Sequence, residues 1–374
     1  MTIKRITFLQ ELLKLIGLDG RLHLEWISSA EARKFVQVVT DFTEKIRTLG
    51  PNPLPAFSTK IKATDQRPAS ELLKKPVSLY RDILRVQHRM QDTHTEINMK
   101  NKVKLWLEDG TIDIFIGYKM MEGHPLPHCF TRNNMEEIDE LVTGPLRYPL
   151  EKIATDIAAE LPDAKIGILA RDCNIRALNV LYIWNQLDSD NIKTVTVNCC
   201  PSNLKKHGDC SYLEAEKAGP YKRQVGMDNN MDTGDMETYD QPERLSRWMY
   251  EFQKCIKCYG CRDICPVCFC KVCSLDHPDL VRPGILPPEV PIFHLVKAVH
   301  MAGRCIDCGL CEEVCPVDIP LRLLYRMVNE IVMNIFHYDT GTNPEQSPFS
   351  VLGDEVTLEP IPLEGIKSNN PISI

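Results

Sequence analysis

Two cysteine runs with the same spacing constrain this chain more than any other feature. They span residues 255–266 and 305–316, and both read C-x2-C-x2-C-x3-C-P. The chain has 16 cysteines, and most of them lie between Cys255 and Cys315. Clustered cysteines in a chain without a secretory signal indicate metal binding or redox chemistry rather than disulfides. This segment is therefore expected to fold around a metal group that its thiolates hold.

The spacing is that of the bacterial proteins that bind two 4Fe–4S clusters. Three cysteines within seven residues wrap a loop around three corners of a cubane, so that backbone amides can point at its sulfurs. The fourth cysteine ligates the other cluster, and the proline after it supplies no competing amide. We assign Cys255, Cys258, Cys261 and Cys315 to cluster one, and Cys305, Cys308, Cys311 and Cys265 to cluster two.

Paired zinc knuckles are the alternative for C-x2-C pairs, and two complete runs with a trailing proline disfavour them. The stretch between Cys265 and Cys305 is longer than a minimal ferredoxin needs. It begins with three more cysteines, Cys268, Cys270 and Cys273. These thiols either ligate iron or pack beside cluster one as small apolar side chains, and both interpretations stay open.

Other cysteines lie upstream of the two runs. Cys173 lies where a predicted strand turns into a helix, whose end amides stabilise a thiolate. Cys200 ends the next predicted strand, and ligands usually bind at the carboxyl ends of strands in such sheets. One interpretation is a third 4Fe–4S cluster held by Cys129, Cys173, Cys200 and Cys210, and the other is ordinary buried thiols.

Composition and charge narrow the class of protein. The net charge of −7 and the absence of a long basic block argue against nucleic-acid binding and against a basic membrane-binding patch. The apolar runs are too short to span a bilayer, and the N-terminus does not have the pattern of a signal peptide. We therefore expect a cytoplasmic chain with no membrane span and no nucleic-acid partner.

The residues before the cysteine runs have a β–α–β pattern. Residues 165–170 and 194–200 read as strands and residues 175–187 as the helix between them, which predicts a small, mainly parallel α/β sheet. A further strand is predicted at 112–117 and a helix at 321–336. The predicted order is a helical segment at 1–57, a linker at 58–77, an α/β domain at 78–219, an acidic linker at 220–241, a two-cluster ferredoxin domain at 242–338 and a proline-rich tail at 339–374.

The N-terminal segment resembles a known family. The stretch RLHLEWISSAEARKFVQVVTDFTEKIRTLGPNP, within residues 1–57, resembles the C-terminal tail of the delta subunit of methyl-viologen-reducing hydrogenase. The resemblance implies a segment that links a hydrogenase or formate dehydrogenase to heterodisulfide reductase A, a flavoprotein. The cluster-binding cysteines of that family have no counterpart, because the first cysteine here is Cys129. Only the docking role carries over.

Residues 100–340 resemble a second family, the iron–sulfur beta subunits related to deazaflavin-reducing hydrogenase and formate dehydrogenase beta chains. The resemblance rests on DGTIDIFIGY, KIGILARDCNIRAL, EFQKCIKCYGCRDICPVCFCKVC and HMAGRCIDCGLCEEVCPVDIPLRLL. Some members of the family bind FAD and reduce a deazaflavin. This chain has no phosphate-binding loop of the G-x-G-x-x-G kind, so FAD binding stays open.

Together these features predict an electron-transfer iron–sulfur subunit of a multi-subunit anaerobic oxidoreductase. It would relay single electrons between a hydrogenase or formate dehydrogenase-type subunit and a flavin-containing protein similar to heterodisulfide reductase A. One alternative is a flavin-dependent deazaflavin, formate or hydrogen oxidoreductase beta subunit with its own FAD site, which flavin absorbance would favour. Another is a structural adaptor, which clusters that resist reduction would favour.

Overall fold

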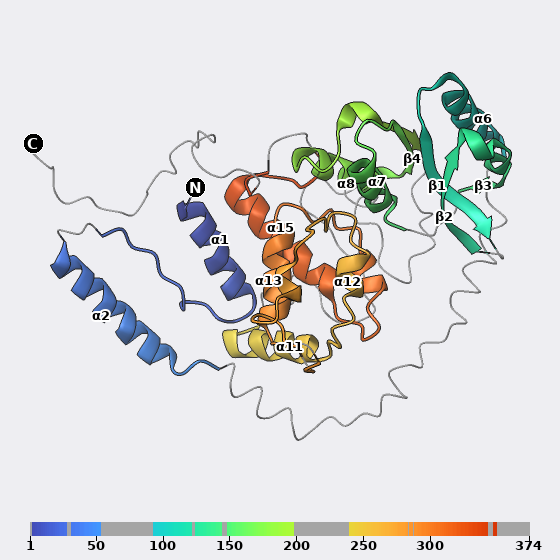
Figure 1. Cartoon of the computed structure of the whole chain (residues 1–374). Coiled ribbons are helices and arrows are strands. Elements are labelled where there is room, and N and C mark those ends of the chain that lie inside the picture. The colour runs from blue at the N-terminus through green and yellow to red at the C-terminus, as the bar shows by residue number, and fades with distance from the viewer. Residues whose placement is uncertain are drawn as a thin grey trace, which may run out of the picture.

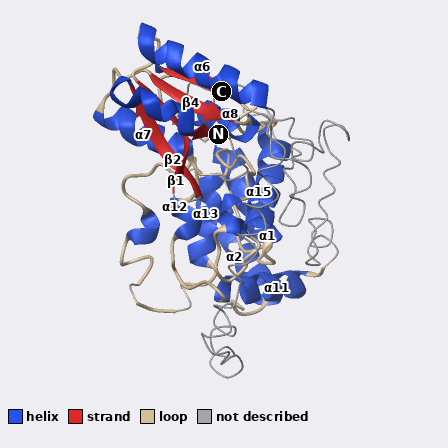
Figure 2. Ribbon diagram, turned by 90° about the vertical axis from the view of Figure 1, so that its right-hand side faces the viewer, coloured by secondary structure: helices blue, strands red, loops and turns tan. Residues whose placement is uncertain are grey.

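The structure is a computed structural model with two main parts. Figures 1 and 2 show a small sheet with its helices at one end of the molecule and a helical body at the other. The body carries both cysteine runs. No helix within the described ranges is both long and apolar enough to cross a bilayer. The structure describes residues 2–27, 31–53, 93–121, 124–143, 148–197, 239–282, 284–286, 288–342 and 347–349.

The strand β4 (Ile166–Ala170) lies inside the sheet, and every one of its residues is buried. β1 (Ile114–Met121) and β5 (Ile192–Thr196) run parallel to it on either side. An uninterrupted apolar run is typical of a strand covered on both faces. The parallel core predicted from the β–α–β pattern is therefore present, and the sheet order is β2-β1-β4-β5.

The sheet also contains two antiparallel pairings that the sequence analysis did not predict. β2 (His124–Thr131) forms a hairpin with β1, and β3 (Leu141–Val142) pairs with the second half of β1. β2 is an edge strand that contains Pro125 and Pro127. In a strand, the backbone nitrogens of residues two apart point to the same side. The nitrogens of both prolines can therefore face away from β1, and no hydrogen bond between the two strands is lost. The sheet is therefore mixed, with a parallel core and an antiparallel edge.

Helices cover the sheet. α6 (Thr93–Asp109) and the 3-10 helix η2 (Arg132–Glu140) pack together against the hairpin. α7 (Leu150–Glu160) and α8 (Asp172–Ile183) pack on β4 and on each other. The short 3-10 turn η3 (Ser189–Asn191) leads into β5. The first turn of α8 therefore lies at the carboxyl end of β4.

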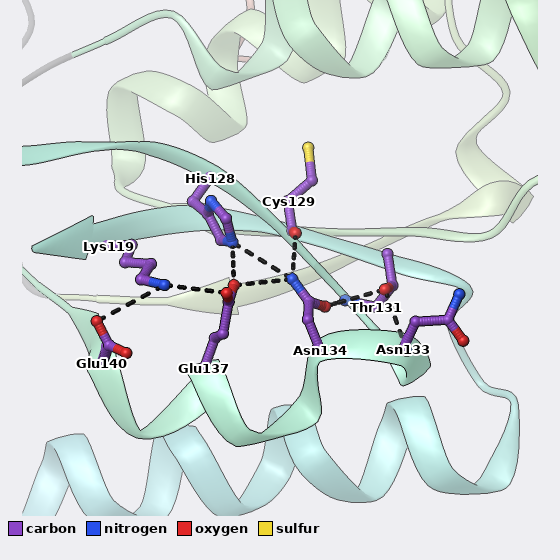
Figure 3. A network of polar contacts seen from close by, with 8 residues as sticks. All are labelled: Lys119, His128, Cys129, Thr131, Asn133, Asn134, Glu137 and Glu140. Atoms are coloured by element: carbon purple, nitrogen blue, oxygen red, sulfur yellow. Dashed lines mark hydrogen bonds and ion pairs between the residues drawn. The ribbon is translucent and has the colours of Figure 1, made fainter. Parts of the chain in front are cut away.

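A polar network fastens β2 to η2 (Figure 3). The Glu137 carboxylate accepts a bond from Lys119 Nζ at 3.1 Å, and it lies 2.6 Å from His128 Nε2. The side-chain amide of Asn134 donates to Glu137 at 2.9 Å and to the Cys129 carbonyl at 3.3 Å. The hydrogen bond from Lys119, followed by that from His128, holds the pKa of Glu137 below its usual value. The Cys129 thiol points away from this network.

The helical body is built around one apolar core. Its largest buried side chains include Trp248, Phe252 and Phe8. The helix predicted at 321–336 is confirmed as α15. The helices of the body are α11 (Gln241–Gln253), α12 (Gly260–Asp263), the 3-10 turn η5 (Ser274–Asp276), α13 (Ile292–Met301), α14 (Leu310–Glu313) and α15 (Leu321–Phe336).

The first helix of the chain, α1 (Thr2–Leu15), belongs to the same core. It packs along α15, and its buried residues Phe8 and Leu12 join the apolar cluster of the body. Gly17 follows with a φ of +83°, and a Cβ at that position would lie 2.3 Å from the Gln241 carbonyl oxygen. Only glycine allows this close approach. The first part of the segment predicted at 1–57 thus shares its core with the body.

The second helix, α2 (Ala32–Leu49), lies apart from the body beyond α1 (Figure 1). Arg21 holds its C-terminus by donating to the Leu49 carbonyl at 3.2 Å. Much of its apolar stripe faces solvent, which is unusual for a helix with so regular an apolar pattern. The exposed apolar side chains are Phe35, Val36 and Val39, with exposed fractions of 55%, 62% and 45%.

The chain after α15 returns to the sheet domain. Arg176 of α8 donates to the Thr340 carbonyl at 3.0 Å, and Asn179 donates to the Gly341 carbonyl at 3.1 Å. Thr340 is buried. The start of the tail predicted at 339–374 therefore packs between the two parts of the fold, and most of its remaining residues lie outside the described ranges.

Candidate iron–sulfur centre

The two cysteine runs adopt the same backbone conformation. In the first run, Lys257 and Tyr259 have positive φ angles of 53° and 57°, and α12 follows. In the second run, Asp307 and Gly309 have positive φ angles of 55° and 79°, and α14 follows. Left-handed residues between ordinary ones turn successive amides toward one point, which makes a concave site for negative charge.

Backbone amides reach three of the predicted ligand sulfurs, as the spacing argument expects. Hydrogen bonds of this kind favour the thiolate over the thiol and tune the potential of a bound cluster. They join Lys257 N to Cys255 Sγ, Asp307 N to Cys305 Sγ and Ile319 N to Cys315 Sγ, each at 3.4 Å.

The four thiols predicted for cluster one lie close together. Burial first, and then the neighbouring Cys261, Cys258 and Cys315, raise the pKa of Cys255 to about 11. Cys315 is buried and comes from the second run, whereas Cys258 is exposed. The structure therefore brings the fourth thiol across from the other run, as the ferredoxin pattern predicts.

The four thiols predicted for cluster two also converge. Burial, followed by Cys308, Cys305 and Cys265, raises the pKa of Cys311 well above its ordinary value. These four residues and Cys261 line one cavity, and Cys265 comes from the first run. Each run thus lends its fourth thiol to the other group.

This donor set fits 4Fe–4S clusters. Thiols with raised pKa values stay protonated at neutral pH until a cation binds and draws off their protons. Cubane iron would supply that positive charge, and the apolar side chains of Val267, Met301 and Ile306 line the cavity wall beside the thiols. The assignment of the eight thiols as ligands remains a prediction, which iron analysis tests.

A buried lysine lies beside both groups of thiols. Lys297 of α13 is 3% exposed and lines the same cavity. Burial acts to lower the pKa of Lys297, but Cys265, Cys268 and Cys261 outweigh it, and the pKa lies above its ordinary value. One turn earlier, burial and then Lys297 lower the pKa of His294 to about 3. His294 is therefore neutral at neutral pH, and Lys297 is charged when the neighbouring thiols are ionised.

The residue before the second cysteine has opposite charge in the two runs. Lys257 of the first run pairs with Glu289 at 3.3 Å. Asp307 of the second run is buried and pairs with Arg322 at 2.8 Å and with Arg326 at 3.5 Å. A buried carboxylate such as that of Asp307 is stable only when positive charges pair with it. Sequence analysis missed these pairs, because the partners lie outside the cysteine runs and no local pattern joins them.

The additional cysteines of the insertion have different neighbours. Cys273 packs with Phe293 in a small apolar cluster beside the first run, which agrees with the packing interpretation. Cys268 is partly buried near Cys265 and Lys297. Cys270 is exposed, and its sulfur lies 3.7 Å from the Arg304 guanidinium.

The cysteines of the predicted third cluster lie in different places. Cys129 is on the edge strand β2 and packs with the sheet core, whereas Cys173 is in the first turn of α8 and packs with the helical body. Cys200 and Cys210 lie outside the described residues. Among the residues that the structure does describe, no three His, Cys, Asp or Glu side chains converge on a single-ion site. The third cluster remains a prediction.

A second, smaller pocket lies where the sheet domain meets the second run. Glu151, Arg171, Cys173 and Cys308 are among its lining residues. Glu151 is 1% exposed, and Asn174 donates to its Oε1 at 2.6 Å. Burial raises the pKa of Glu151 to about 7, although Asn174 and Arg171 oppose the shift. The sequence pattern marked the start of α8 but not this carboxyl group from α7.

The converging thiols and the paired left-handed loops define a ferredoxin-type iron–sulfur domain attached to a mixed α/β domain. Residues 298–320 match the family described as 4Fe-4S binding domain. Residues 1–50 match the family described as methyl-viologen-reducing hydrogenase, delta subunit. The N-terminal resemblance predicted from the sequence is therefore confirmed.

Curated relatives confirm the second resemblance. The chain is 38% identical over 104 residues to F420-dependent formate dehydrogenase subunit beta of Methanocaldococcus jannaschii, which is 28% of this chain and 27% of the relative. It is 42% identical over 104 residues, with the same shares, to F420-dependent formate dehydrogenase 1 subunit beta of Methanococcus maripaludis. It is 43% identical over 54 residues to an iron-sulfur subunit of the F420-non-reducing hydrogenase vhu of Methanocaldococcus jannaschii, which is 14% of this chain and 40% of the relative. The chain thus spans about a quarter of the length of the formate dehydrogenase relatives, because the aligned part is 27% of each of them.

Proposed function

We propose that this chain is the electron-transfer iron–sulfur subunit of a multi-subunit anaerobic oxidoreductase. Its two 4Fe–4S clusters relay single electrons between a hydrogenase or formate dehydrogenase-type subunit and a flavin-containing protein similar to heterodisulfide reductase A. The names of the matched relatives support the first partner, because they are subunits of hydrogenases and formate dehydrogenases. The match at residues 1–50 supports a docking role for the N-terminal segment.

The observation that carries the proposal is the exchange of thiols between the two runs. Cys261 belongs to the first group and lies in the short helix α12, whereas Cys265 belongs to the second group and follows two residues after the end of that helix. Four residues of helix rise only about 6 Å. Both residues also line the same cavity. Two clusters held in this way would be neighbours, which a relay requires.

Each 4Fe–4S cluster, when bound, takes up and gives back one electron. The residues of this chain hold the thiolates, donate amide hydrogen bonds to three of the sulfurs and exclude water from the cavity. They need no group that makes or breaks bonds in a substrate. The chain therefore acts by positioning and by tuning potential.

The first group of thiols has access to the surface. Cys258 is exposed, and the neighbouring apolar side chains of Ile256 and Val314 are 44% and 39% exposed. A Cβ built on Gly260 would contact both Val314 and the Cys258 sulfur at ordinary distances, so these groups form one continuous patch. This patch supports cluster one as the point of exchange with a partner protein.

Iron analysis of the full chain, purified without oxygen, tests the proposal. The wild-type chain should contain about eight irons in two clusters and give paramagnetic signals after dithionite reduction. Cys258→Ala and Cys308→Ala should each lose about four irons, whereas Cys270→Ala, an exposed thiol outside both groups, should lose none. Bound zinc, or an unchanged iron content in Cys258→Ala and Cys308→Ala, would refute the ligand assignment.

Flavin quantitation on the same sample separates the proposal from its enzymatic alternative. Stoichiometric FAD would favour a beta subunit with its own flavin site. Electron transfer from a reduced hydrogenase or formate dehydrogenase protein to the flavoprotein partner, without flavin in this chain, would support the relay.

A further inference from the structure

Lys297 is a buried cation that lies beside thiols of both groups. It lies on the inner face of α13 between His294 and Met301, and only 3% of it is exposed. It lines the cavity of the second group together with Cys261 of the first. The negative groups that act on it most strongly are Cys265, Cys268 and Cys261, followed by Cys311.

The charge of Lys297 has no carboxylate partner among the described ion pairs. Three other cations beside the runs do have one. Lys257 pairs with Glu289, and Arg322 and Arg326 share Asp307. A buried, unpaired ammonium is costly unless negative charge faces it. With the clusters bound, the ligand thiolates would be the negative charge that faces Lys297.

Reduction of a 4Fe–4S cluster adds one negative charge without moving any ligand. A fixed positive charge in the same low-dielectric cavity stabilises the reduced cluster more than the oxidised one. Such a charge therefore raises the reduction potential. Because Lys297 lines the cavity of the second group, its effect should be larger on cluster two than on cluster one.

We propose that Lys297 tunes the potentials of this relay, holding both clusters at a higher potential than their thiolates alone would, and favouring cluster two. This role rests on the proposed function, since it needs both clusters. It does not depend on the identity of either partner protein.

The test compares Lys297→Met with the wild-type full chain, both loaded with iron, in redox titrations followed by electron paramagnetic resonance. Lys297→Met should keep its iron and shift the oxidised-to-reduced ratio of cluster two at least tenfold toward oxidised at a fixed potential, about 59 mV for one electron. Lys297→Arg should stay within about twofold of the wild type. Lys271→Met, which removes an exposed lysine of the same domain, is the matched control and should also stay within twofold.

Two outcomes would overturn the inference. One is a Lys297→Met chain that keeps its iron and both wild-type potentials. The other is loss of iron in both Lys297→Met and Lys297→Gln with full iron in Lys297→Arg, which would make the charge a requirement for assembly rather than for tuning. A wild-type chain without two clusters would instead contradict the proposed function.

Discussion

Replacing Phe8 with alanine tests whether α1 is part of the ferredoxin core. Phe8 is 2% exposed, and its ring meets the Phe349 ring edge to face with centroids 5.4 Å apart. Losing the burial alone costs about 1.5–3 kcal/mol, and the cavity left behind brings the total to about 3–5 kcal/mol. At roughly 2–4 °C per kcal/mol, the unfolding temperature should fall by about 6–20 °C.

The assay follows thermal unfolding without oxygen, using helix content and the visible absorbance of the clusters as two probes. Both transitions should shift together, because α1 and the cysteine runs share one core. Ile3→Ala, on the same helix at a position that is 44% exposed, should shift neither by more than a degree or two. A Phe8→Ala chain that loses helix early but releases its clusters at the wild-type temperature would refute the reasoning.

Two further variants probe other parts of the fold. Burial raises the pKa of Glu151 from an ordinary 4.5 to about 7, so the native chain keeps a proton that the unfolded chain releases, and stability should fall by roughly 3 kcal/mol as pH rises through that window. In urea unfolding across these pH values, the fall of the unfolding free energy with pH should disappear in Glu151→Gln. It should persist in Glu160→Gln, an exposed site on the same helix. An unchanged pH dependence in Glu151→Gln would contradict the raised pKa of Glu151. Val39→Glu places a charge on the exposed apolar stripe of α2 and should weaken binding to a flavoprotein similar to heterodisulfide reductase A roughly tenfold in an interferometry assay. Gln37→Glu, an exposed polar site on the same helix, should leave that binding unchanged, and equal affinity for both variants would remove α2 from the interface.

Local patterns predicted the elements whose sequence and burial agree. β4 is apolar throughout and lies inside the sheet, and α15 repeats apolar residues at helical spacing over its whole length. The cysteine runs were also predictable in conformation, because their spacing, with a glycine among the left-handed positions of the second run, leaves few ways to close the loop. In each case the information lies within one short stretch of chain.

Other features depend on contacts that a single stretch does not contain. The prolines of β2 argue against a strand, and only its position at the sheet edge makes them acceptable. The apolar face of α1 predicts from the sequence that this helix packs against another element. The sequence does not identify that element as α15. Lys297 could have been noticed, because a lysine four residues after Phe293 falls on the buried face of α13. Its chemical meaning appears only when the thiols of both runs surround it.

The two cysteine runs have one backbone conformation but different surroundings, and the difference would give the proposed relay a direction. The exposed Cys258 and its apolar neighbours open the first group to the surface. Lys297 lines the cavity of the second group, which has no exposed thiol. A positive charge raises the affinity of the nearer cluster for an electron. If both clusters bind as proposed, an electron that enters beside Cys258 is therefore drawn toward the interior, and a partner that accepts electrons from cluster two must dock near that second group rather than at the patch around Cys258.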